Sequence, residues 1–438
     1  MGLFQQWTRV MDTLQDEMLH CILSRVPASD LLALRLVCRR WSRVILARPV
    51  WQGRHLIARN YAYQGMPPDW INTGLLCAIV RLVPALRRLS LIVQPGSLAG
   101  LPAARALARG TCQVQSLELS VQLLSKRGSS LNHGAMAALR RMLQGLCLVE
   151  LKLDIYVSDE ANHTYAAQRV VSKKMRQILG WVSMLPVAKL KFSFNCGRSQ
   201  RSQYWNNHSH DDCVSGELTG LTALRELHIV NCFCCGAGLS STRSLLARNT
   251  LQSLRADGDI SPVLSDLPRN LRELHIPTTR DWGFLRQCEN LDVLTVFARG
   301  HSDDSLDSLG RLLSLQGLPR EVRVVVSGCG VAKLLVRATF LGQVRLLELE
   351  HCHYENHAHW IQLLQRLVAV TDLRLGPTFE PLLPAALFWW PEDAVPRLAS
   401  LTIPCGTWRH WQHDVSHVRA VVGRLKTSRP RLVLKTYN

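Results

Sequence analysis

The sequence has no long hydrophobic run. None of its apolar stretches approaches the length of about 18 residues that marks a membrane helix. The first ten residues, MGLFQQWTRV, are not a basic region followed by a long apolar core, which a secretion signal requires. We therefore expect neither a membrane span nor a signal peptide.

The chain also lacks the short motifs of common enzymes. It contains no phosphate-binding loop, no G-x-S-x-G and no carboxylate pair that suggests catalysis. Gly328 and Gly330 lie between an expected strand and an expected helix, as in a dinucleotide-binding turn, but Lys333 takes the place of the third glycine. We interpret this turn as structural, predict a non-enzymatic chain without a cofactor, and keep a nucleotide-using enzyme as a third hypothesis.

Acidic residues are scarce. The chain has 33 Asp and Glu against 52 Lys and Arg, which gives a formal net charge of +19. Such a charge attracts acidic proteins or nucleic acid. However, no run of five Lys or Arg occurs, and no RNA-binding motif with interleaved aromatic residues is present. We expect a mildly basic surface suited to an acidic target protein, with nucleic acid an unlikely partner and no membrane partner.

Fourteen cysteines without a secretion signal suggest reduced thiols and residence in the cytoplasm, the nucleus or both. The Cys232–Cys235 cluster lacks a distant C-x-x-C partner for zinc. The histidines around Cys352 and the pair His413 and His417 favour a structural or solvated role over metal ligation. We therefore predict no metal site.

Residues 14–51 carry three short amphipathic segments. The first, Glu17 to Arg25, spaces its apolar residues as one helical face, and Pro27 follows it. A second helix begins with Ser29 or Asp30 as its cap, and a third runs from about Cys38 to Ala47, closed by Pro49. A unit of about 40 residues buries so much leucine only with outside help. It packs either on the rest of the chain or on another protein.

The order of these residues resembles an F-box. The matching positions are Leu14, Glu17, Ile22, Leu23, Ser24, Val26, Asp30, Leu31, Leu32, Leu36, Val37, Cys38, Arg39, Trp41, Pro49 and Trp51. Gln15 departs from the family pattern, which has proline there. The resemblance implies docking to the Skp adaptor subunit of a cullin-RING (SCF) ubiquitin ligase. It implies a contact surface made of Leu14, Leu19, Ile22, Leu23, Val26, Leu31, Leu32, Leu36, Val37, Cys38, Trp41 and Trp51.

The phrase L-x-x-L-x-L recurs thirteen times after residue 85. Its central positions are Leu89, Leu117, Leu151, Leu190, Leu227, Leu254, Leu274, Leu294, Val324, Leu347, Leu373, Leu401 and Leu432. This is the leucine-rich-repeat signature, in which Asn or Cys at the ninth place turns the chain. One repeat cannot bury its apolar face alone, so neighbouring repeats stack into a solenoid. We predict an α/β repeat with parallel strands on the concave side and helices on the convex side.

Three parts follow from these patterns: an F-box at 10–55, a helical linker at 56–84 and a repeat domain at 85–438. Side chains alternate along a strand, so residues beside the apolar positions face solvent on the concave side. The candidate target-binding residues there are Lys152, Lys189, Lys191, His228, Arg255, His275, Glu348 and Arg374. The same residues also fit an ordinary solvated sheet face.

These observations predict a substrate-recognition subunit of an SCF-type ubiquitin ligase. The front helices bind the adaptor and the repeats hold a target protein, so the chain acts by proximity and performs no bond chemistry. The alternative is a repeat scaffold without ligase function, in which the front helices only cap the solenoid.

Overall fold

The computed structural model describes most of the chain in separate stretches. These are residues 14–59, 70–95, 100–123, 130–156, 165–195, 220–230, 250–257, 260–299, 303–315, 318–328, 330, 334, 344–350, 352, 356–376, 390–391, 393–404 and 423–437. The chain divides into two compact units, Met1–Leu245 and Leu246–Asn438. In the described residues, no helix is long and apolar enough to cross a bilayer.

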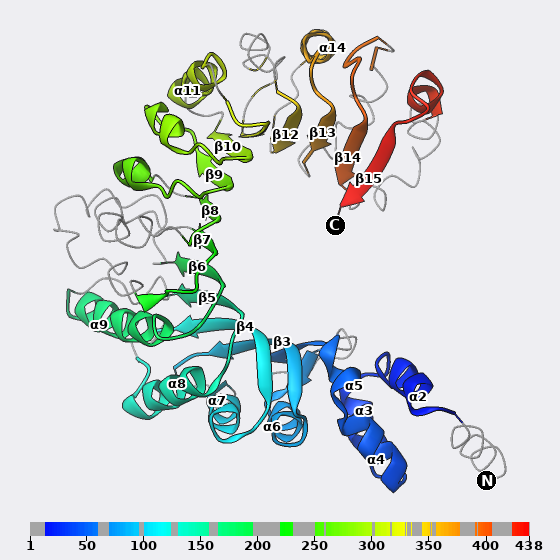
Figure 1. Cartoon of the computed structure of the whole chain (residues 1–438), viewed down its shortest axis with the longest axis vertical. Helices are drawn as coiled ribbons and strands as arrows, with labels where there is room; N and C mark the ends of the chain where they lie inside the picture. Colours follow the sequence, from blue (N-terminus) through cyan, green and yellow to red (C-terminus); the bar gives the residue numbers. More distant parts are fainter. Residues whose placement is uncertain are drawn as a thin grey trace. The chain divides into compact units, whose positions relative to one another are not determined.

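The described part of unit 1 opens with four short helices (Figure 1). They are α2 (Asp16–Leu23), α3 (Ala28–Leu34), α4 (Arg39–Leu46) and α5 (Arg48–Gln52). The expected cap at Ser29 or Asp30 is wrong, because α3 starts earlier, at Ala28, with Pro27 in the N-cap position. Cys38 caps α4 by accepting a hydrogen bond from the Trp41 backbone N–H. Pro49 does not simply close α4 but lies in the first turn of α5, where its missing N–H costs no helical hydrogen bond.

The remainder of unit 1 is a parallel sheet with strand order β7-β6-β5-β4-β3-β1-β2. The strands are β1 (His55–Arg59), β2 (Trp70–Asn72), β3 (Ala85–Val93), β4 (Gln113–Gln122), β5 (Glu150–Tyr156), β6 (Lys189–Asn195) and β7 (Glu226–Val230). Four helices alternate with them: α6 (Thr73–Leu82), α7 (Gly100–Arg109), α8 (His133–Gly145) and α9 (Tyr165–Val182). These helices lie side by side along one face of the sheet (Figure 1).

Unit 2 repeats the same architecture. Its parallel strands follow the order β15 to β8: β8 (Ser253–Ala256), β9 (Glu273–Pro277), β10 (Val293–Arg299), β11 (Glu321–Ser327), β12 (Leu346–Glu350), β13 (Asp372–Leu375), β14 (Ser400–Pro404) and β15 (Val433–Tyr437). Between them lie the 3₁₀ helices η6 (Ser261–Asp266) and η7 (Gly283–Gln287) and the helices α11 (Asp303–Leu313) and α14 (His357–Arg366).

All thirteen predicted repeat strands are present, as β3 to β15. In β3 to β14 the inward positions of the L-x-x-L-x-L phrase are buried, as at Leu151 and Leu153 in β5. In β15 the partner of Leu401 is Leu434, which is half-buried, and not the predicted central Leu432. At the ninth place Cys352 is 2% exposed, and its Sγ lies 3.6 Å from the Val326 carbonyl oxygen of the neighbouring strand. This contact back to the neighbouring strand is the kind that Asn or Cys makes at the ninth place of a repeat. Cys232 and Cys329 lie outside the described residues.

The predicted helical linker at 56–84 is partly wrong. Its start lies in β1, which pairs in parallel with β2 and with β3. Leu56 and Ala58 of β1 are buried at alternate positions, a pattern that a two-residue period explains and a helical one does not. The later part of the predicted linker does contain a helix, α6.

Candidate functional site

The front helices expose an unusual amount of apolar surface. Met18 is 51% exposed, Ile22 40%, Leu36 78% and Val37 43%. Met18 and Ile22 lie one turn apart on α2, whereas Leu36 and Val37 occupy the turn between α3 and α4. Hydrophobic side chains left in water are available for a second protein.

The twelve residues predicted for the adaptor contact fall into two groups. Ile22, Leu36 and Val37 are exposed, and Leu14, Val26, Leu32 and Cys38 are half-buried. The other five form the interior of the helical unit instead: Leu19 is 1% exposed, Leu23 2%, Leu31 0%, Trp41 9% and Trp51 0%. A fully buried side chain has no surface left for a partner. For these five, packing among the helices replaces the expected direct contact.

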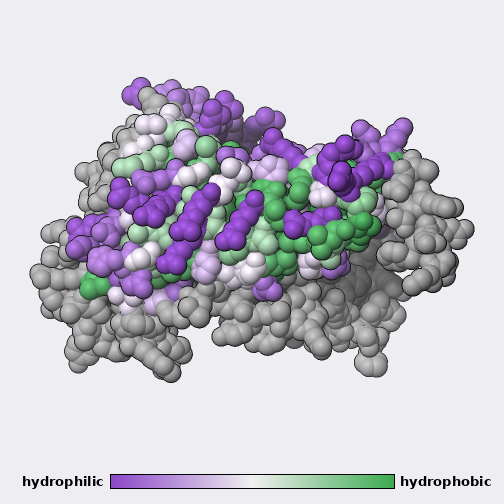
Figure 2. Space-filling view, turned by 90° about the horizontal axis from the view of Figure 1, so that it is seen from below, coloured by the Kyte–Doolittle hydropathy of each residue, from purple (hydrophilic) through white to green (hydrophobic). Residues whose placement is uncertain are grey.

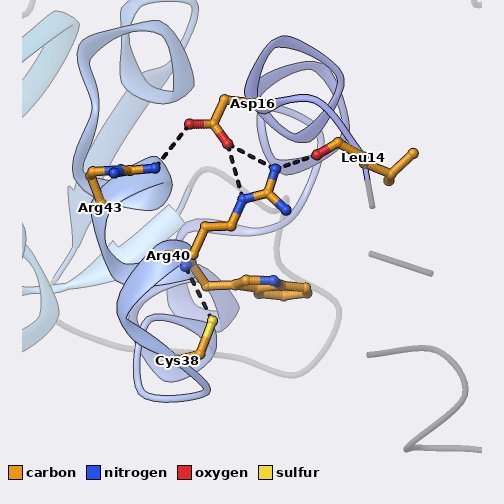
Figure 3. Close-up of polar contacts among 6 residues, drawn as sticks. Leu14, Asp16, Cys38, Arg40 and Arg43 are labelled. Carbon is orange, nitrogen blue, oxygen red and sulfur yellow. Dashed lines mark hydrogen bonds and ion pairs between the residues drawn. The ribbon is translucent and has the colours of Figure 1, made fainter. Parts of the chain in front are cut away.

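An ion-pair cluster fixes α2 against α4 (Figure 3). Asp16 Oδ1 accepts hydrogen bonds from Arg40 Nε at 3.1 Å and Nη2 at 2.9 Å, and its Oδ2 pairs with Arg43 Nη2 at 3.2 Å. Arg40 also donates to the carbonyl oxygen of Leu14. The hydrogen bond from Arg40, with a smaller contribution from Arg43, lowers the pKa of the Asp16 carboxyl. The cluster holds the start of α2 in place.

A second contact joins the helices to the sheet. Trp51 on α5 donates its indole N–H to the Ile45 carbonyl oxygen at 2.6 Å. The guanidinium of Arg54, 7% exposed, lies 5.5 Å from the Trp51 ring and donates to the carbonyl oxygens of Val50 at 3.0 Å and Leu23 at 2.7 Å. The Arg54 carbonyl oxygen accepts from Arg88 N on β3. One arginine thus links α2, α5 and the first long strand.

Sequence reasoning missed several of these residues. The contact prediction did not include Met18, although its spacing of four from Ile22 places both on one helical face. Asp16, Arg40, Arg43 and Arg54 carry no periodic signal, because their partners lie more than twenty residues away in the chain.

The predicted target-binding residues of unit 1 lie together on one sheet face. Lys152 on β5, Lys191 on β6 and His228 on β7 are consecutive register partners. Lys189 occupies the adjacent row and pairs with Glu226 Oε1 at 2.6 Å.

A hydrogen-bonded chain extends the first of these rows toward the front helices. His55 Nε2 lies 2.7 Å from Ser90 Oγ, which donates to Glu118 Oε2 at 2.6 Å. Glu118 faces Lys152 at 3.9 Å. Polar side chains from β1 to β7 therefore form one connected surface.

In unit 2 the predicted residues form two separate pairs. Arg255 and His275 are register partners on β8 and β9, and the Arg255 guanidinium lies 5.2 Å from the Phe297 ring centroid. Glu348 and Arg374 are register partners on β12 and β13, 3.7 Å apart as an ion pair. Strands β10 and β11 lie between the two pairs.

Two carboxyl groups on this sheet face have raised pKa values. Burial raises the pKa of Asp154, and the positive charges of Lys152 and Lys191 partly offset this rise. Burial also raises the pKa of Glu348, with a further contribution from Glu350 and opposition from Arg374. Both groups therefore lose part of their solvation to the surrounding sheet without a compensating ion pair of equal strength.

The described residues contain no group of three or more Cys, His, Asp or Glu side chains able to hold a metal ion. Burial raises the pKa of the Cys112 and Cys288 thiols to about 11, so neither is a reactive thiolate at neutral pH. Gly328 has a φ of 72° and its N–H donates to the Glu350 carbonyl oxygen, which is the geometry of a turn between repeats. The clusters at 232–235 and 413–417 lie outside the described residues.

Comparison with known proteins agrees with this geometry at the front of the chain. Residues 11–53 match the F-box domain family. No curated protein sequence matches the chain.

Two solved structures are similar in part. The leucine-rich repeat-containing protein LegL7 from Legionella pneumophila is 14% identical, with a TM-score of 0.44, over 77% of this chain and 97% of that one. A chain of the yeast Rad7 and Elc1 complex is 13% identical, with a TM-score of 0.37, over 92% of this chain and 90% of that one. With scores this low, the fold assignment rests on the strands and their register.

The parallel strands, the buried L-x-x-L-x-L positions and the alternating helices define a leucine-rich-repeat protein. Its front helices add an F-box domain at residues 11–53. The chain is therefore an F-box domain joined to leucine-rich repeats.

Proposed function

We propose that this chain is the substrate-recognition subunit of an SCF-type E3 ubiquitin ligase. The observation that supports this most strongly is the F-box match at 11–53 together with exposed Met18, Ile22, Leu36 and Val37 on those helices. F-box domains bind Skp-type adaptors in cullin-RING ligases. The four exposed side chains, with half-buried Leu14, Val26, Leu32 and Cys38 at their margin, are the proposed adaptor contact.

The proposed role of the repeats is to hold a target protein. The row of Lys152, Lys191 and His228 in unit 1 offers positive charge and hydrogen-bond donors to an acidic surface. The pairs Arg255–His275 and Glu348–Arg374 in unit 2 supply further contacts. The chain itself performs no bond chemistry. It raises the effective concentration of the target near the ubiquitin-charged enzyme.

Co-purification with the Skp adaptor tests the proposal. The variant Ile22→Asp/Leu36→Asp places charge on two exposed positions and is expected to lose adaptor capture while keeping its thermal unfolding temperature. The matched control is Val149→Asp/Met184→Asp, which alters side chains that are 53% and 73% exposed elsewhere in unit 1. Capture of the wild type and the control alone supports the ligase role. Equal capture of all three proteins, or of none, contradicts it.

The scaffold alternative is supported by one observation. Helix α5 packs directly on β3, and Trp51 is completely buried there. Deleting the front helices therefore exposes apolar surface under either hypothesis and does not separate them. Surface variants at Ile22 and Leu36 separate the two hypotheses. If the helices only cap the solenoid, the wild type does not bind the adaptor and the charged variants change nothing.

A further inference from the structure

Four consecutive helices of unit 1 contain no acidic residue. Helices α6, α7, α8 and α9 together carry seven arginines and two lysines, and neither Asp nor Glu occurs in any of them. By contrast, α11 of unit 2 contains three aspartates and one arginine. Helix α14 of unit 2 also lacks Asp and Glu but carries a single arginine, so it is the accumulation of arginine and lysine that is local to the helical side of unit 1.

The fold gathers these basic residues on one surface. Arg105 and Arg109 on α7 and Arg140 and Arg141 on α8 are all exposed, and so is Arg81 on α6. Helices α6, α7 and α8 are direct neighbours in the helical layer. Figure 2, seen from below the view of Figure 1, shows hydrophilic side chains standing in stripes among pale residues and hydrophobic ones. We call the surface formed by Arg81, Arg105, Arg109, Arg140 and Arg141, with Lys173 and Arg176 of α9, the basic helical face.

Nothing in the described part of unit 1 neutralises the centre of this face. Arg105, Arg109, Arg140 and Arg141 form no ion pair with any described carboxylate. The carboxylates of the nearby strands belong to the opposite side of the sheet, because they alternate with the leucines that pack under the helices. Two further acids, Asp159 and Glu160, precede α9 outside the described residues.

The start of α8 adds to the positive potential. The guanidinium of Arg105 reaches from α7 to the first turn of α8. If Gly134 carried a side chain, its Cβ would lie 3.9 Å from Arg105 Nη2. The first turn of a helix carries a partial positive charge from its backbone N–H groups. The positive charge of Arg105 adds to this partial charge and is repelled by it, so the fold itself gains nothing from the placement. A bound anion would be attracted by both charges and would offset the repulsion.

The side chains between the arginines indicate which kind of anionic partner fits this face. On α7 and α8 the exposed neighbours are short or polar: Pro102, His133, Gly134, Ala137, Gln144 and Gly145. Among the described side chains of α6 to α9, no Phe, Tyr or Trp ring is exposed, the imidazole of His133 is the single exposed aromatic ring, and the exposed apolar residues Leu82 and Val170 stand singly on α6 and α9. Protein interfaces depend on aromatic or apolar anchors, and single-stranded nucleic acid depends on stacking platforms. A duplex backbone needs only arginine and lysine.

We propose that the basic helical face binds the phosphate backbone of double-stranded nucleic acid without reading its sequence. The scattered positions of these arginines in the chain led to the opposite expectation. Their clustering is a product of helix packing. The proposal does not depend on the ligase role, since the F-box helices and the strand face contribute nothing to it.

Binding through phosphates makes a quantitative prediction. Each phosphate contact contributes about −0.9 to the slope of log affinity against log salt for duplex DNA. Replacing four contacting arginines by glutamine should reduce the magnitude of this slope by about 3.6 and weaken binding at low salt by at least about 100-fold. A surface that binds only through overall net charge shows no such dependence on position.

The experiment measures fluorescence anisotropy of a labelled 30-base-pair DNA duplex with the full chain between 50 and 200 mM salt. The test variant is R105Q/R109Q/R140Q/R141Q. The matched control is R269Q/R272Q/R286Q/R311Q, four exposed arginines of unit 2. Both variants lower the formal net charge of +19 by four. Adaptor capture and thermal unfolding confirm that each variant is folded. A duplex RNA of the same sequence distinguishes the two nucleic acids.

The expected result is salt-dependent duplex binding by the wild type and the control, with loss in the test variant. Equal weakening of both variants would assign binding to net charge and overturn the proposal, as would no wild-type binding at 50 mM salt. Tighter binding to polyglutamate or to anionic lipid vesicles than to a duplex of equal charge would assign the face to an acidic protein or a membrane. In either case the duplex proposal would be wrong.

Discussion

At the scale of single residues, Arg54 has the largest structural role that no sequence pattern predicts. It places a charged group under the helices, 7% exposed, and satisfies two backbone carbonyl groups from different helices. Arginine suits this task because its planar guanidinium presents several donors at once. Its loss removes the side-chain donor of the Val50 carbonyl oxygen and leaves the Leu23 carbonyl oxygen with the Val26 backbone N–H, at 3.2 Å, as its remaining donor.

We therefore expect Arg54→Gln to lower the free energy of unfolding of unit 1 by about 1–3 kcal/mol, the cost of one buried unpaired group. Chemical denaturation followed by far-UV circular dichroism measures the change. Arg48→Gln is the control, because Arg48 is an exposed arginine on the adjoining helix α5. A similar small effect of both substitutions would contradict the linking role of Arg54.

Asp16 makes the F-box region sensitive to acid. Its pKa in the folded chain lies below the ordinary value of 3.8 because Arg40 and Arg43 stabilise the carboxylate. A depressed folded pKa gives stability that is present above the unfolded pKa and is lost as the pH falls through the folded pKa. We expect Asp16→Asn to unfold at lower denaturant concentration than wild type at pH 7, and the difference to shrink below about pH 4. A difference that stays constant with pH would rule out the carboxylate as its cause.

At the scale of the turn between repeats, Gly328 has a φ of 72°, which ordinary residues avoid. The left-handed conformation costs a residue with a side chain about 1–2 kcal/mol. We expect Gly328→Ala to destabilise unit 2 by this amount. Gly145→Ala should be neutral or stabilising, because a Cβ there meets nothing within 4 Å and the residue ends α8. Thermal unfolding of both variants provides the comparison. Equal unfolding temperatures would contradict the turn interpretation.

At the scale of whole elements, α5 is both the last F-box helix and part of the sheet's covering. Trp51 is 0% exposed and its indole is hydrogen-bonded. We expect Trp51→Ala to cost about 3–5 kcal/mol and to lower stability and adaptor binding together. Ile22→Asp should affect adaptor binding alone. Denaturation and adaptor capture, measured on the same samples, separate the two effects. Adaptor loss without destabilisation in Trp51→Ala would show that this element was wrongly interpreted.

At the scale of the whole molecule, stability is distributed over stacked repeats. Each strand contacts only its neighbours in the order of the sheet. In such a protein the energy is roughly a sum of repeat and nearest-neighbour terms. The consequences of a core substitution should therefore remain near the altered repeat.

This expectation is testable with two equivalent substitutions, Leu190→Ala in β6 of unit 1 and Leu373→Ala in β13 of unit 2. Both leucines are at most 2% exposed, and truncation of a buried leucine costs about 2–5 kcal/mol. Hydrogen exchange should show lost protection in the altered unit and retained protection in the other. Uniform loss over both units would indicate that the chain unfolds as one cooperative body.

The sequence predicted the repeat strands well because their signal is local and repeated. Leu117 and Leu119, for example, are placed inward by the two-residue period of a strand, whatever else the chain does. The same reasoning failed at β1, because a five-residue strand with one neighbouring basic stretch carries no repeat phrase. It also treated Leu31 and Trp51 as contact residues, since a family pattern marks positions and does not state which way a side chain faces.

The sequence by itself determined the class of fold, the order of the repeats and the F-box at the front, because periodic apolar residues and an in-register motif are properties of neighbouring positions. The tertiary structure alone decided which apolar side chains remain exposed on α2 and beside α3, how Arg54 joins helices to the sheet, and that arginines from separate helices share one face. Exposure and charge clustering depend on which surfaces meet. Residues far apart in the chain share a surface only after the helices have packed.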